Sequence, residues 1–186
     1  MQEVGKMSKR KVALTLICED TQQECFVRRF LNGMGWGKRQ LRIEKSPSGR
    51  GSGEQWVREK YAAELANYRK SHVQYAILTI VDGDVHGVSY RTNQFDNKCI
   101  EKEIPVRNNL ETVAIIVPTR NIETWIKYLE GEKVDETTIY PKLNNESDCK
   151  PAVDRLLNFY KGIGLPKDAP QSLNAARNEF RSRIRR

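Results

Sequence analysis

The sequence predicts an α/β fold built on a parallel four-stranded sheet flanked by helices. Three apolar runs and one short alternating segment have the length and β-branched content of strands, at residues 11–18, 41–45, 76–81 and 112–117. A segment of helical character follows each of them. This alternation is expected when parallel strands are joined by helical crossovers.

The first two helices have recognisable starts. Thr21 and Glu24 have the spacing of a capping box, and apolar residues then recur at helical positions until closely spaced glycines end the pattern. Ser52 is predicted to cap a second helix that runs to about Lys70, with an apolar face of aromatic and aliphatic residues. Both helices are therefore expected to pack on the sheet.

The second half of the chain is predicted to be mainly helical. Residues 88–103 are polar and expected to form a helix, and residues 119–131 carry apolar side chains at helical spacing. These elements complete an α/β domain over residues 11–131. Residues 132–186 are expected to form a helical appendage whose last helix is basic.

Bulk properties limit the class of protein. The chain has 186 residues, a formal net charge of +8 and a pI near 9.4. This charge favours a polyanionic partner such as nucleic acid, although many basic proteins bind none. Neither a bilayer-spanning stretch nor a signal-peptide pattern is present, so we expect a cytoplasmic protein with no membrane partner. The four cysteines lack a zinc-binding spacing and are expected to be reduced.

Carboxylates follow two of the predicted strands at the point where each strand ends. Glu19 comes directly after the first strand, and Asp82 and Asp84 come after the third. The carboxyl ends of parallel strands share one edge of a sheet, so we expect these acids to meet. Clustered carboxylates repel unless a cation lies between them, and Mg²⁺ or Mn²⁺ prefers such oxygen ligands. A solvated Asp-Gly-Asp turn without metal is the alternative.

Three further acids are auxiliary candidates for the same site: Asp20, Glu24 and Glu123. The capping box offers Glu24 a purely structural task, namely a bond back to the Thr21 amide. Glu123 lies in the first turn of a predicted helix, where the helix dipole alone favours a carboxylate. Glu19 has no comparable structural explanation.

Four arginines are candidate contacts for phosphate. Arg50 lies in a Gly/Ser-rich loop, Arg120 lies in the first turn of the helix predicted over residues 119–131, and Arg181 and Arg183 belong to the basic tail. A plain flexible connection is the favoured explanation of the loop, and a solvated helix end explains the tail as well as a nucleic-acid contact does. The loop lacks the lysine of a nucleotide-binding P-loop, which excludes that motif.

The order of strands, helices and acids resembles the Toprim domain, which is shared by topoisomerases, bacterial primases and the overcoming-lysogenization-defect nucleases. That family carries a glutamate after its first strand and a DxD motif after its third, often with a glycine three residues beyond. Glu19, Asp82, Asp84 and Gly87 match these positions. The resemblance covers roughly residues 11–130 and implies a Rossmann-like Toprim fold.

One position departs from the Toprim pattern. The family usually has a glycine directly after the glutamate, where this chain has Asp20. The larger side chain would either crowd the approach of a phosphate or give the metal another ligand. Whether the chemistry of the family is retained therefore depends on how Asp20 is placed.

The resemblance implies a Mg²⁺- or Mn²⁺-dependent nuclease that cleaves DNA or RNA, with Glu19, Asp82 and Asp84 as metal-binding and catalytic residues. Small Toprim proteins often partner ATPases in bacterial anti-phage defence, so an ATPase partner is expected, and a homodimer is a further expectation. Two other functions stay open. One is a noncatalytic regulatory or interaction module, and the other is a phosphoryl-transfer enzyme acting on a small molecule.

Overall fold

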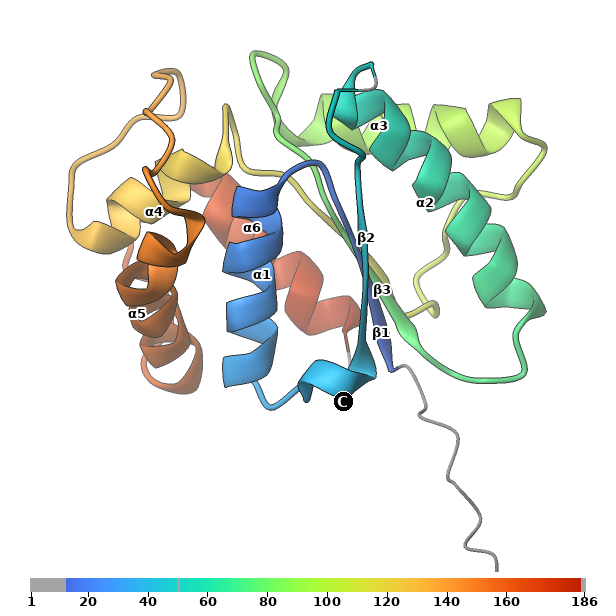
Figure 1. The fold of residues 1–186 in the computed structure, drawn as a ribbon, viewed down its shortest axis with the longest axis horizontal. Helices are drawn as coiled ribbons and strands as arrows, with labels where there is room; N and C mark the ends of the chain where they lie inside the picture. Colours follow the sequence, from blue (N-terminus) through green and yellow to red (C-terminus); the bar gives the residue numbers. More distant parts are fainter. Residues whose placement is uncertain (1–12, 50, 185–186) are drawn as a thin grey trace, which may run out of the picture.

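The computed structural model of the chain describes residues 13–49 and 51–184. Its centre is a four-stranded parallel sheet with the strand order β2-β1-β3-β4 (Figure 1). The strands are β1 (Leu14–Cys18), β2 (Leu41–Lys45), β3 (Ala76–Ile80) and β4 (Val113–Ile116). The predicted α/β class is therefore confirmed. Residues 11–12 of the first predicted strand lie outside the described residues.

Helices flank the sheet, as the sequence predicts. The α-helices are α1 (Thr21–Gly33), α2 (Gly53–Lys70), α3 (Gly87–Glu101), α4 (Ile122–Glu130), α5 (Lys150–Lys161) and α6 (Gln171–Arg183). Two short 3-10 helices are η1 (Lys38–Gln40) and η2 (Glu146–Cys149). Within residues 13–49 and 51–184, no helix combines the length and apolar character needed to cross a bilayer.

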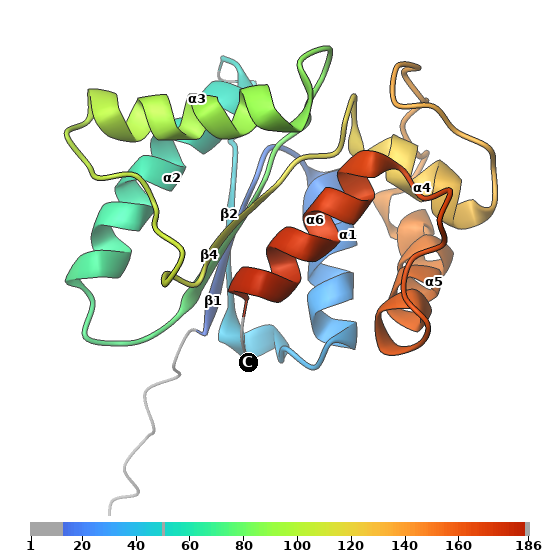
Figure 2. The ribbon, with the colours of Figure 1, turned by 180° about the vertical axis from the view of Figure 1, so that it is seen from behind.

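Alternate side chains of the strands enter two different cores. Leu16 and Leu78 pack with α1, α4, α5 and α6, whereas Ile17 and Ile77 pack with α2 and α3. Figure 2 shows α6 lying across the sheet beside β4, with α2 and α3 on the other side. Because both faces are covered, the central strands are apolar at nearly every position. This explains the continuous apolar runs in the sequence.

The C-terminal helices belong to one of these two cores. Leu156 of α5 and Phe180 of α6 are buried in the same cluster as Leu78 of β3. The boundary expected at residue 131 therefore does not separate two cores, because residues 132–186 supply part of the hydrophobic surface that covers the sheet.

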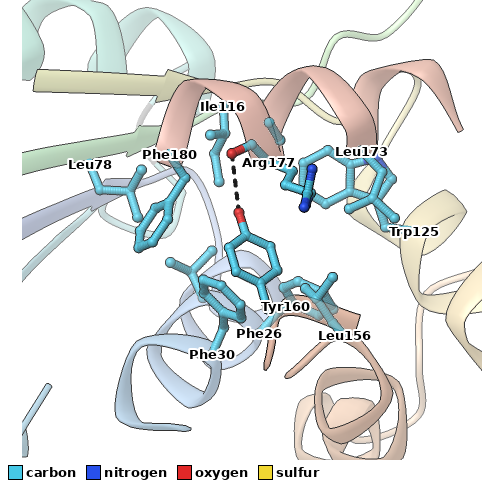
Figure 3. Close-up of a pocket in the computed structure, with 12 residues that line it drawn as sticks. Phe26, Phe30, Leu78, Ile116, Trp125, Leu156, Tyr160, Leu173, Arg177 and Phe180 are labelled. Carbon is cyan, nitrogen blue, oxygen red and sulfur yellow. Dashed lines mark hydrogen bonds between the residues drawn. The ribbon is translucent and has the colours of Figure 1, made fainter. Parts of the chain in front are cut away.

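A small apolar cavity lies where α1, α5 and α6 meet the sheet (Figure 3). Its volume is about 30 Å³. The ring of Phe30 packs edge-on against Tyr160 and Phe180, with centroids 4.9 and 5.4 Å away. The Tyr160 hydroxyl donates a hydrogen bond to the Arg177 carbonyl at 3.3 Å. A void of this size and character holds no substrate, so the functional site must be sought elsewhere.

Truncation of one aromatic side chain tests the role of α6. Phe180→Ala removes a buried ring and should lower the free energy of unfolding by about 3–5 kcal/mol. Urea denaturation followed by circular dichroism measures the change. Ile163→Ala is the control, since this side chain is exposed and its loss should change stability by less than about 0.5 kcal/mol. Equal effects of the two substitutions would contradict the shared core.

Candidate functional site

The loops that follow β3 and β4 are tied together at the carboxyl edge of the sheet. The Gly83 amide donates to the Pro118 carbonyl at 2.7 Å, and the backbones of Asp84 and Arg120 pair in both directions at 3.0 and 3.2 Å. A Cβ at Gly83 would lie 3.0 Å from the Pro118 oxygen. A side chain at position 83 would therefore force the two loops slightly apart, and glycine permits the close approach.

Glu19 and Asp82 are joined by hydrogen bonds at this edge. The Asp82 amide donates to Glu19 Oε2 at 2.8 Å. The buried Gln23 side chain donates from Nε2 to Glu19 Oε2 at 3.3 Å and to Asp82 Oδ1 at 3.0 Å, and its Oε1 accepts from the Glu19 amide at 2.9 Å. The structure thus brings two of the predicted acids together, and it adds Gln23, which sequence reasoning missed.

The start of α1 orients Gln23. Asp20 is the N-cap, and its Oδ1 accepts from the Gln23 amide at 2.9 Å. The predicted capping box, with Thr21 as the cap, is wrong by one residue, because the preceding carboxylate reaches the amide three positions further on. Glu24 instead forms an ion pair with Lys45 Nζ at 3.0 Å. In the part of the chain that the structure describes, Glu24 forms no hydrogen bond with Glu19 or Asp82.

Burial makes the paired carboxyl groups hard to ionise. The pKa of Asp82 is raised well above its ordinary value of 3.8, first by burial and then by the nearby charges of Glu19 and Asp20. Burial also raises the pKa of Glu19, against the opposing effect of the hydrogen bond from the Asp82 amide. A proton or a cation is therefore favoured at this position.

Glu123 adds a further buried carboxyl group. It lies in the first turn of α4 and is 2% exposed, and its Oε1 has no hydrogen-bond partner among residues 13–49 and 51–184. Burial raises the pKa of Glu123, the charge of Asp20 raises it further, and Glu123 in turn raises the pKa of Asp82. Lys142 Nζ lies 3.4 Å from Asp20 Oδ2. Four acids therefore interact here: Glu19, Asp20, Asp82 and Glu123.

The Asp84 carboxylate has a different partner from the other acids. Its exposed carboxylate pairs with the Arg91 guanidinium, which also donates to the Asp82 carbonyl at 2.9 Å and lies 3.0 Å from Glu54. Asp84 still raises the pKa of Glu19 through its charge. It lies beside the Glu19 and Asp82 pair without sharing their hydrogen bonds, so the expected three-carboxylate cluster is not assembled in the predicted form.

The acids offer suitable donor atoms for a metal, but they do not form a complete group of ligands. In the part of the chain that the structure describes, no group of three or more His, Cys, Asp or Glu side chains is arranged to hold an ion. The donor chemistry nevertheless fits a hard divalent cation, since all the donors are carboxylate oxygens and Glu123 Oε1 is buried without a partner. A cation bound beside Glu123 would satisfy that oxygen and offset the repulsion among the acids.

The start of α2 closes one side of this edge. Ser52 caps the helix as predicted, accepting from the Gln55 amide at 3.4 Å. A Cβ at Gly53 would lie 3.4 Å from Glu19 Oε1. The end of the Gly/Ser-rich loop therefore packs against the Glu19 carboxyl group, and the helix N-terminus favours negative charge there.

The predicted phosphate contacts are distributed over two ends of the molecule. Arg120 lies at the acidic edge, paired through its backbone with Asp84, and its buried Nε has no hydrogen-bond partner in the part of the chain that the structure describes. Arg181 and Arg183 lie in the last turn of α6, at the amino end of the sheet (Figure 2), where Arg183 donates to the backbone before β4. Arg50 lies outside the described residues.

A scan against models of protein families finds no match, and searches of curated proteins and of solved structures return no significant match. The resemblance to the Toprim domain therefore stays a prediction from the sequence.

Replacement of Gln23 tests its connecting role. Gln23→Met keeps the length of the side chain but removes the amide shared by Glu19 and Asp82, and should cost about 1–3 kcal/mol of stability. The loss of stability should be larger at pH 8 than at pH 5, because the hydrogen bonds from the Gln23 amide are stronger when the carboxyl groups that accept them are ionised. Urea denaturation at both pH values measures it. Gln22→Met, at the neighbouring buried glutamine, should show no such pH dependence.

Removal of the Asp82 carboxylate tests the electrostatics. The pKa of Asp82 is higher in the folded state than its ordinary value of 3.8, so the folded protein binds a proton that the unfolded chain has already released. Without a cation, this carboxyl group therefore lowers the free energy of unfolding as the pH rises from 3.8 through its pKa in the folded state. Asp82→Asn should therefore increase stability relative to wild type at pH 8 and change it little at pH 4.

Thermal unfolding with a chelator, between these two pH values, measures the effect of Asp82→Asn. Asp154→Asn is the matched control, because Asp154 is an exposed acid on α5 that pairs with Lys150. If thermal stability changed with pH in the same way in wild type and in Asp82→Asn, the pKa of this carboxyl group would not be raised by folding.

Proposed function

We propose that the protein is a Mg²⁺- or Mn²⁺-dependent nuclease of the Toprim type, which cleaves phosphodiester bonds of nucleic acid in the cytoplasm. The observation that carries the proposal is the contact between Glu19 and Asp82 at the carboxyl edge of a parallel sheet. The unpartnered oxygen of Glu123 and the raised pKa values of these groups support it. The net charge of +8 fits a polyanionic substrate.

The acids divide into two roles in this proposal. Asp82 and Glu123 would hold the cation, which when bound polarises a phosphoryl oxygen and stabilises the leaving alkoxide. Glu19 is fixed by the Asp82 amide and by Gln23, and burial raises its pKa. It is thus suited to accept a proton from the attacking water or to return one to the leaving oxygen.

Basic residues near the acids would bind the substrate phosphate. The exposed Lys142 ammonium lies beside Asp20, and its pKa is raised by Asp20 first and by Glu123 and Asp82 further. Arg120 adds a guanidinium whose Nε lacks a partner. Cations at these positions neutralise phosphate oxygens and orient the scissile bond.

A noncatalytic module is the second candidate function. It is favoured by one observation, namely that Asp84 is already neutralised by Arg91 and completes no ligand group with Glu19 and Asp82. The partners implied by the Toprim resemblance, an ATPase and a role in anti-phage defence, fit either function and stay predictions.

Cleavage assays test the nuclease. Wild-type protein should degrade labelled DNA or RNA with Mg²⁺ or Mn²⁺ and not with a chelator, while Asp82→Asn and Glu19→Gln should lower the rate by about 10²-fold or more. Glu123→Gln should weaken Mn²⁺ binding, measured by calorimetry, by about tenfold, because one charged ligand is lost. Asp154→Asn should behave like wild type in both assays.

Two results would contradict the nuclease. Cleavage that persists in Asp82→Asn would show that the activity does not come from this site. Mn²⁺ binding at Asp82 and Glu123 without cleavage of any DNA or RNA, with or without the ATPase partner, would favour the noncatalytic module.

A further inference from the structure

A polar groove lies between α2 and α3, beside the candidate site. Its volume is about 550 Å³, and it is lined by Arg58, Tyr90, Asn93, Gln94, Asn97, Lys98 and Glu101. All of these residues except Arg58 come from α3, which begins three residues after Asp84. The groove therefore starts close to the acidic edge and leads away from it along one helix.

Two stacked aromatic rings stand at the end of α3 nearest the acids. His86, the N-cap of α3, stacks on Tyr90 with ring centroids 4.2 Å apart and an interplanar angle of 25°. Tyr90 is 46% exposed, and His86 is exposed as well. An exposed aromatic stack offers its outer face to a further flat ring, and such platforms bind nucleobases without regard to their sequence.

The charges in the groove are already compensated. Lys98 Nζ lies 2.9 Å from Glu59 and 2.6 Å from Glu101, and Arg58 lies 3.0 Å from Glu54. A groove that tracks a phosphate backbone would instead present cations without partners.

The uncommitted hydrogen-bonding groups in the groove are amides. Asn93 and Asn97 are exposed one turn apart on α3, and neither side chain bonds to another described residue. An amide offers one donor group and one acceptor, the combination that pairs with the edges of unpaired bases. Both the aromatic stack and the amides therefore fit bases better than phosphates.

We infer that the groove between α2 and α3 binds unpaired nucleobases, so that the ligand is single-stranded nucleic acid with one base stacked on Tyr90. In a duplex the bases are paired and stacked on one another, and their ring faces cannot reach Tyr90. His86 lies two residues from Asp84, so a strand bound here brings its neighbouring phosphates to the acidic edge. The assignment of this strand as a substrate rests on the proposed nuclease function, whereas its binding does not.

Binding measured without a divalent cation tests the groove separately from cleavage. Fluorescence anisotropy with labelled oligonucleotides of about 12 nucleotides, in the presence of a chelator, should show that a single strand binds more tightly than a duplex of equal length. Tyr90→Ala should weaken single-strand binding by about tenfold, and Tyr90→Phe, which keeps the ring, should not. Asn178→Ala, at an exposed amide on α6, is the matched control.

Substitution of Asn93 and Asn97 tests whether their amides form hydrogen bonds with the edges of the bases. The double variant Asn93→Ala/Asn97→Ala should reduce the differences in affinity among homopolymers of the four bases, while Tyr90→Ala should weaken binding to all of them. Thermal unfolding checks that each variant is folded. Equal binding of single strand and duplex would overturn the inference, and so would an unchanged affinity in Tyr90→Ala.

Two further outcomes separate this inference from the nuclease proposal. Single-strand binding that depends on Tyr90, without cleavage under any condition, would leave the inference standing and remove the nuclease. Cation-dependent cleavage with an unchanged KM in Tyr90→Ala would do the reverse. Wild-type protein that binds no oligonucleotide would overturn the inference and direct attention to a peptide as the occupant of the groove.

Discussion

The acidic edge depends on one hydrogen bond, from the Asp82 amide to the Glu19 carboxylate. β1 pairs with β3 in parallel register up to Ile17 and Thr79, and the chain of β1 then turns into α1. The amide beyond the end of this ladder would be buried without a strand partner, which is costly. The Glu19 side chain takes the place of the missing strand, so the geometry of the site follows from the ending of the sheet.

Glu19 and Asp82 share a neutral hydrogen-bond partner, Gln23, and this leaves their negative charge without a counter-charge from that side chain. Gln23 donates to both Glu19 and Asp82 but brings no positive charge. An arginine or lysine at position 23 would convert the cluster into an ordinary buried ion pair with lowered pKa values. With an amide there, the negative charge of Asp82 and Glu123 remains to be balanced by a proton or by a bound cation. The half-buried pair of Glu19 and Asp82 is thus poised to respond to either.

Local sequence was sufficient for the sheet and for the position of Glu19 and Asp82, because apolar runs and the residues that end them are properties of neighbouring positions. It was insufficient for Gln23, which lies among polar residues at the start of α1 and is buried only by tertiary packing. Asp20 and Thr21 are both capping residues by type, and aspartate is the better of the two, so the preference for Asp20 could have been read from the sequence. The role of Gln23, in contrast, depends on its contact with Asp82, which lies far away in the chain.

The C-terminal part of the chain contributes charge to the site as well as packing to the core. Asn121 Nδ2 donates to the Tyr140 carbonyl at 3.1 Å, and Gln22 Nε2 donates to the Glu146 carbonyl at 3.3 Å. These two bonds hold the connection between α4 and α5 against the start of α4 and the start of α1. Lys142 lies between the two anchored carbonyls and is thereby brought to the acids. Because Lys142 belongs to this connection, loss of the two hydrogen bonds would withdraw the cation from the acidic edge.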